Sequence, residues 1–78
     1  MPHSTMGNIY IINQSNASIQ VRITSVSNSQ GSVGFFTIAT GQSDSWDRSA
    51  REVAFVQKGG ASAAEVLIVQ PGNTYTIA

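Results

Sequence analysis

The sequence predicts a single all-β domain, a compact antiparallel β-sandwich of about six to seven short strands, with a small barrel as the alternative. Two observations support this fold. No window of the 78 residues shows helical periodicity, because apolar residues either alternate with polar ones or gather in short runs. Turn-forming residues separate these runs at a spacing of about 8–12 residues, which is typical of sandwiches and barrels.

The strands can be assigned in order along the chain. We expect them at residues 7–14, 18–26, 33–38, 43–48, 51–57, 65–70 and 74–78. Serine, asparagine, glycine and proline supply the connections at 15–17, 27–32, 40–42, 58–60 and 71–73. Residues 1–6 are expected to form a disordered tail, so the single β domain spans residues 7–78.

The second expected strand shows the clearest alternation. Ile19, Val21 and Ile23 occupy one face of it. The opposite face carries Gln20, Arg22 and Thr24. This pattern indicates a sheet with one buried and one wet face. The run at 53–56 is nearly continuous in apolar residues, so we expect that strand to be buried on both faces.

A short internal similarity supports this register. Residues 36–46 can be laid over residues 67–77, each segment being a strand, a glycine turn and a second strand. Glycine in the turn fits a backbone position with positive φ. The alignment gives Trp46 and Ile77 equivalent positions in the two segments, and we expect both to face the core.

Composition limits how so small a domain can be stabilised. The chain has no cysteine, and its single histidine is His3. Disulfides, thiolate metal sites and histidine metal clusters are therefore not expected, nor is any cofactor. Only 10% of the residues are charged and the net charge is zero, so copies do not repel each other. We expect a homo-oligomer; the alternative is a monomer kept soluble by its hydroxyls and amides.

The charges also exclude classes of partner. Four basic residues, scattered and matched by four acids, cannot form the basic face that nucleic acid requires. No stretch approaches the ~20 apolar residues of a transmembrane helix. The first seven residues lack the charged and apolar regions of a signal peptide, which predicts a cytoplasmic protein, with release by a non-classical route as a further option.

Catalysis is not expected. General acid–base chemistry needs a positioned histidine or a carboxylate with a shifted pKa. Asp44 and Asp47 lie three apart in a strand, on opposite faces. The serines have no histidine base and no nucleophile-elbow sequence, and the glycines match no phosphate loop. The sequence therefore predicts a protein that acts by binding.

Residues 43–48 form the main candidate binding site. They bring together Asp44, Trp46, Asp47 and Arg48, which are the only tryptophan, two of the four acids and an arginine. An aromatic ring against the apolar face of a sugar, with charged groups fixing its hydroxyls, is a common arrangement for glycan binding. The alternative is that Trp46 fills the core while the charged residues pair on the surface.

Three further residues are weaker candidates. Tyr10 and Tyr75 are amphipathic rings in the two terminal strands. Arg22 projects from the polar face of the second strand. The alternatives are half-buried tyrosines with wet hydroxyls and a plain solvated strand face.

Four segments resemble small leaderless β-sandwich proteins of mushroom-forming fungi. They are residues 8–15 (NIYIINQS), 19–22 (IQVR), 41–46 (GQSDSW) and 52–55 (EVAF). The first hairpin is also similar to that of the aegerolysins, lipid-binding partners of pore-forming toxins. The chain is much shorter than an aegerolysin and lacks tryptophan-rich membrane-facing segments, so no family site residue is carried over. The resemblance implies a lectin-like protein with a defensive role.

These observations lead to three hypotheses. The first is a non-enzymatic carbohydrate-binding protein that acts as a multivalent oligomer, because weak single sites become effective when several reach one surface. The second is a lipid- or membrane-surface-binding protein of the aegerolysin type. The third is a self-assembling structural module that pairs through its sheet edges.

Overall fold

The computed structural model describes residues 7–59 and 64–78. The residues expected to form the N-terminal tail, and Gly60 of the expected 58–60 turn, lie outside these ranges. The described chain is all-β, as predicted, and contains no helix. Its strands are β1 (Gly7–Asn13), β2 (Ile19–Ile23), β3 (Phe36–Ile38), β4 (Ser43–Arg48), β5 (Glu52–Lys58), β6 (Glu65–Val69) and β7 (Thr74–Ile77).

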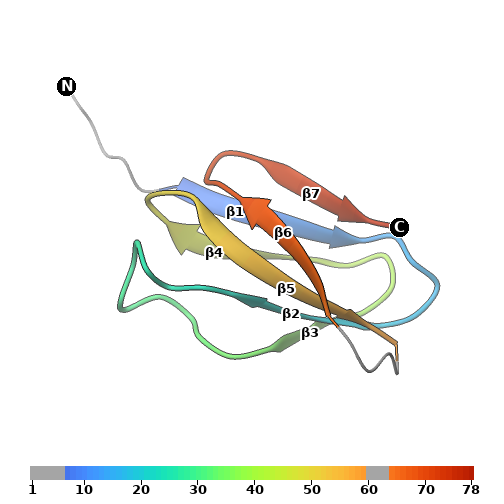
Figure 1. Cartoon of the computed structure of the whole chain (residues 1–78). Coiled ribbons are helices and arrows are strands. Elements are labelled where there is room, and N and C mark those ends of the chain that lie inside the picture. Colours follow the sequence, from blue (N-terminus) through green and yellow to red (C-terminus); the bar gives the residue numbers. More distant parts are fainter. Residues whose placement is uncertain (1–6, 60–63) are drawn as a thin grey trace.

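The strands form two sheets that pack as a small β-sandwich (Figure 1). The three-stranded sheet has the order β4-β1-β7, and the four-stranded sheet has the order β3-β2-β5-β6. The predicted sandwich is confirmed, but one pairing departs from the expected antiparallel arrangement. β1 and β7 are parallel neighbours, with Ile11 opposite Tyr75. The two strands lie near the two ends of the described chain, so no hairpin fixes their direction.

The core lies between the sheets and follows the alternation of the strands. Its buried side chains are Ile9, Ile11, Ile19, Val21, Ile23, Ile38, Trp46, Ala54, Val56, Val69 and Ile77. In β2 the pattern is the expected one, with every second residue buried. Trp46 and Ile77 are 2% and 5% exposed, which confirms the prediction that both face the core.

Two strands differ from the sequence-based expectation. β5 is not buried on both faces: Ala54 and Val56 are buried, whereas Val53 and Phe55 are half-buried on its outer side. The sequence of this strand is continuously apolar because its outer residues, Val53 and Phe55, lie beside the apolar Ile68 and Val66 of β6 on the outer face of the sheet. β3 is shorter than the expected 33–38, because only Phe36–Ile38 pair with β2; Val33 and Phe35 lie exposed in the connection from β2.

The corner after β1 is held by a buried asparagine. The Nδ2 of Asn13 donates to the carbonyls of Ala17 (2.8 Å) and Ile38 (2.9 Å). Its Oδ1 accepts hydrogen bonds from the backbone N–H and the hydroxyl of Ser15. Asn13 thereby ties the end of a strand in one sheet to β3 in the other, and a buried amide with all these partners is stable in the core. The β3–β4 turn follows with Gly41 at a φ of 81°, as its glycine predicts.

Candidate functional site

The structure separates the four residues predicted as a binding cluster. In β4 the side chains alternate, so Trp46 and Arg48 point inward while Ser45 and Asp47 point outward. Trp46 packs edge-to-face against Phe36, with ring centroids 6.3 Å apart, and is 2% exposed. It therefore fills the core and offers no surface to a ligand.

Arg48 is fully buried and holds a loop rather than a ligand. Its guanidinium donates to the carbonyls of Thr24 (2.7 Å), Ile23 (3.2 Å) and Ser32 (2.7 Å), and to its own neighbour Asp47 (2.9 Å). All four acceptors are backbone oxygens, and three of them belong to residues 23–32. The connection between β2 and β3 is thus fastened to the end of β4, which corrects the predicted ligand-binding role of Arg48.

Gly31 lies directly against this guanidinium. A Cβ at position 31 would be 2.2 Å from Nη1 of Arg48 and 3.2 Å from the carbonyl oxygen of Asn28. The loop also bonds to itself at this point, since the N–H of Gly31 donates to that carbonyl (3.0 Å). The position therefore requires glycine for close approach.

Glu52 is the second buried charge and holds the same loop. It is 3% exposed and accepts hydrogen bonds from the hydroxyls of Thr24 and Ser27 and from the N–H groups of Val26 (3.3 Å) and Ser27 (2.6 Å). Burial raises the pKa of Glu52, but these four hydrogen bonds outweigh it and hold the pKa below its ordinary value. Through these hydrogen bonds the start of the 27–32 loop, at Ser27, is fastened to β5.

The remaining sequence candidates lie apart from one another. Asp44 is exposed on the edge strand β4, where its Oδ1 accepts the N–H of Ser45 (2.8 Å). Arg22 lies on the outer face of the four-stranded sheet, 5.2 Å from the Phe55 ring centroid. The half-buried Tyr75 accepts a hydrogen bond from the N–H of Gln70 (3.0 Å). These three residues do not form one site.

A different surface emerges on the outer side of the three-stranded sheet. We call it the hydroxyl face and define it by the outward residues of β1, β4 and β7: Asn8, Tyr10, Ile12, Ser43, Ser45, Asp47, Thr74 and Thr76. Tyr10, 43% exposed, lies in the central strand with Ser45 directly on one side and Thr74 on the other. Neighbouring Cα atoms at such positions are about 4.5–5.5 Å apart, so the ring is flanked by hydroxyls on both sides.

The hydroxyls of this face are not used by the fold. Ser15, Thr24, Ser27 and Ser49 all make side-chain hydrogen bonds within the protein. Within residues 7–59 and 64–78, the hydroxyls of the face make none; these are Ser43, Ser45, Thr74 and Thr76. Their donors and acceptors are therefore available to a ligand or to water.

Sequence reasoning placed only Asp47 of this face in the main binding site, although a signal for the rest was present. The internal similarity aligns the hydroxyl pair at 43 and 45 with the pair at 74 and 76. Alternate hydroxyls in a strand lie on one face. The signal was incomplete, because the sequence does not show that β4 and β7 flank the same central strand.

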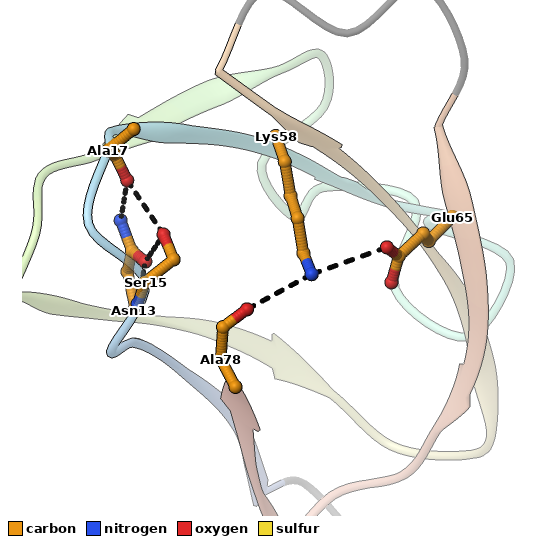
Figure 2. Close-up of polar contacts among 6 residues, drawn as sticks. All are labelled: Asn13, Ser15, Ala17, Lys58, Glu65 and Ala78. Carbon is orange, nitrogen blue, oxygen red and sulfur yellow. Dashed lines mark hydrogen bonds and ion pairs between the residues drawn. The ribbon is translucent and has the colours of Figure 1, made fainter.

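A hollow of about 480 Å³ opens at one end of the sandwich. Figure 2 shows the Lys58 side chain ending between Ala78 and Glu65. Its ammonium donates to the carbonyl of Ala78 (3.0 Å) and lies 3.4 Å from a carboxylate oxygen of Glu65. None of the described residues that line it is aromatic; they are Gln14, Ser15, Asn16, Ala17, Lys58, Gly59 and Ala78.

Residues 7–59 and 64–78 contain neither a metal site nor a membrane-spanning helix. No group of three histidine, cysteine or acidic residues there could hold a metal ion. That part of the chain also has no helix long and apolar enough to cross a membrane. No protein-family model, curated protein or solved structure matches the chain. The resemblance to mushroom β-sandwich proteins and the expected absence of catalysis stay predictions.

Gly31→Ala should destabilise the fold by about 1–3 kcal/mol, because the added methyl displaces the Arg48 guanidinium from its carbonyls. Urea unfolding followed by circular dichroism measures the change. Ser32→Ala is the control, because that side chain is exposed, makes no hydrogen bond to the residues that the structure describes and belongs to the same loop. Equal stabilities for the two variants would contradict the close contact at Gly31.

Glu52 should make stability fall at acid pH. Its folded pKa is below the unfolded value of about 4.3, so the unfolded chain binds the proton more readily. The contribution is fully present above the unfolded pKa and is lost as the pH falls through the folded pKa. Glu52→Gln should flatten this part of the stability curve in urea unfolding at pH 2–7. An unchanged pH dependence in the variant would show that Glu52 is not the responsible group.

Proposed function

We propose that the protein is a non-enzymatic carbohydrate-binding protein that acts as a multivalent oligomer, and that the hydroxyl face is its sugar site. One observation carries the proposal: an exposed tyrosine ring flanked on both sides by hydroxyls that make no hydrogen bond within the described protein. An aromatic ring offers a rigid apolar surface at low entropy cost. Hydroxyls, which both donate and accept, complement the hydroxyls of a sugar.

The shape of the face also suits a sugar. A three-stranded sheet is a shallow surface, and a pyranose can lie on it with one apolar face against Tyr10. Ile12, the next outward residue of β1, extends the apolar strip and lies between Ser43 and Thr76. Asp47, opposite Asn8, supplies a carboxylate at the end of this strip, and charge-assisted hydrogen bonds are the stronger ones.

The hollow at the Lys58 end supports this function less well. The Lys58 ammonium already has two partners, Ala78 and Glu65. None of the described residues that line the hollow is aromatic. A sugar there would gain hydrogen bonds without the ring contact. The hydroxyl face provides both kinds of contact.

Tyr10→Ala should weaken glycan binding about tenfold or more, while Tyr10→Phe should retain most of it, because the ring and not the phenol carries the contact. A glycan array identifies the sugar, and calorimetry with that sugar as a monovalent ligand measures the affinity. Ser45→Ala and Thr74→Ala should each weaken binding about threefold to tenfold. Thr37→Ala is the matched control, because this exposed strand threonine belongs to β3 of the other sheet and makes no side-chain hydrogen bond within the described residues.

Full affinity in a folded Tyr10→Ala variant would exclude the hydroxyl face as the site. An array without any bound glycan would contradict the carbohydrate-binding function itself.

Trp46→Ala separates this site from the one expected from sequence. Removing the buried ring should cost about 3–5 kcal/mol of folding free energy. Sugar binding should then fall only in proportion to the unfolded fraction, measured by circular dichroism at each temperature. A well-folded Trp46→Ala variant that has lost sugar binding would return the site to residues 43–48.

A further inference from the structure

We infer that the protein forms a symmetric dimer by antiparallel pairing of β6 with β6 of a second copy. The inference deepens the oligomer part of the proposed function and rests on that part alone. Its starting point is the position of β6, which is the last strand of the four-stranded sheet and lies beside β5 (Figure 1). One side of β6 therefore carries backbone groups that no strand of the described chain pairs.

The hydrogen-bond pattern identifies these groups. The N–H of Thr24 donates to the carbonyl of Val53 (2.9 Å), so the backbone polar groups of Val53 point toward the β2 side. The next residue, Ala54, points toward β6 and pairs with Leu67. Leu67 therefore points its backbone groups at β5, and its neighbours Val66 and Ile68 point theirs outward.

The free edge of β6 is blocked for further pairing at its C-terminal end and has no protecting residues in the middle. The backbone N–H of Gln70 points to the same free side as those of Val66 and Ile68, but it already donates a hydrogen bond to the Tyr75 hydroxyl (3.0 Å). Glu65, the only charge in β6, lies 3.4 Å from the ammonium of Lys58 in the same chain. Charged side chains, prolines and bulges normally protect such edges, and residues 66–69 carry no charge and no proline.

The side chains at this edge are also exposed and apolar. Val66 is 59% exposed and Ile68 is 60% exposed, and both lie on the outer face of the sheet beside Phe55 and Val53. The other three edge strands differ. β3 has three residues, β4 carries Asp44 and Asp47, and β7 has four residues with two outward threonines.

The strand is complementary to itself. Pairing all five residues antiparallel places Leu67 opposite Leu67 of the second copy and Val66 opposite Ile68. Val66 and Ile68 then exchange about four backbone hydrogen bonds across the two-fold axis. Their side chains meet on the outer face and form one continuous apolar stripe. The interface needs no charge pairing, which suits a chain of zero net charge.

The symmetry has a consequence for sugar binding. Because outward residues meet outward residues, the two-fold axis is perpendicular to the sheet. Both three-stranded sheets then lie on the same side of the continuous sheet that results from joining the two four-stranded ones. The two hydroxyl faces point the same way, so one dimer presents two sites to one glycan-bearing surface.

Analytical ultracentrifugation over a concentration series tests the dimer directly. The wild-type mass should rise from 8.2 kDa toward twice that value as concentration increases. Val66→Lys should raise the dissociation constant at least tenfold, because an ammonium would lie against Ile68 of the second copy. Val33→Lys is the matched control, since it changes an exposed valine (65%) away from β6. Circular dichroism confirms that both variants fold.

A cysteine variant tests the register without relying on a lysine. Leu67→Cys should form a disulfide-linked dimer rapidly, because residues opposite each other at a non-hydrogen-bonded pair have Cα atoms about 4.5 Å apart, within disulfide range. The chain has no other cysteine, so the product is unambiguous. Val33→Cys reports the rate of random collision. Equal crosslinking rates, or a wild-type mass of 8.2 kDa at millimolar concentration, would overturn the proposal.

The remaining outcomes separate this inference from the others. A monomer that co-sediments with phosphatidylserine vesicles, and loses this with Val66→Lys, would assign the apolar edge to a lipid surface and overturn the dimer. If the dimer is correct, Val66→Lys should abolish agglutination of glycan-bearing cells while leaving calorimetric binding of the monovalent sugar unchanged. Loss of dimer formation alone, or of sugar binding alone, therefore shows which proposal has failed.

Discussion

Two buried charges, Arg48 and Glu52, fix the longest connection of the sandwich. Arg48 donates N–H groups to backbone carbonyls, and Glu52 accepts hydrogen bonds from N–H and hydroxyl groups. The two side chains thus bind the acceptors and the donors, respectively, of residues 23–32. A loop without such partners would leave its polar backbone groups to water and would stay mobile. Here it leads in a defined path to β3, where Phe36 reaches Trp46 and extends the core.

The same arrangement explains the neutral surface. The chain has only four basic and four acidic residues, and one of each is buried under this loop. Lys58 and Glu65 neutralise each other at the end of β6. Hydroxyls and amides therefore carry most of the surface polarity, and such groups form hydrogen bonds without long-range charge repulsion. The burial of Arg48 and Glu52 therefore both fixes the loop and lowers the charge of the surface.

The sequence predicted what depends on strand parity and local turns. The inward set of β2 and the core positions of Trp46 and Ile77 follow from the period of two. The sequence-based candidate site combined Trp46 and Arg48, which the structure buries, with the exposed Asp44 and Asp47, because proximity in sequence was given more weight than the alternation of side chains along the strand. The partners of Arg48 on the β2–β3 side lie 16 to 25 residues away, and no local pattern shows that their carbonyls converge on it. The parallel pairing of β1 with β7 is equally non-local, and it creates the hydroxyl face.

The alternation of side chains along the strands also determines the two proposed surfaces, the sugar site and the dimer edge. In β4 it sends Trp46 inward and leaves Ser45 and Asp47 on the hydroxyl face; in β6 it sends Leu67 inward and leaves Val66 and Ile68 exposed. A one-residue shift in either strand would exchange these sets and expose the core. The fold therefore places no requirement on the outward residues, provided that the inward ones remain apolar. The proposed sugar site and the proposed dimer edge lie on different sheets, so pairing through β6 leaves both hydroxyl faces open to a ligand.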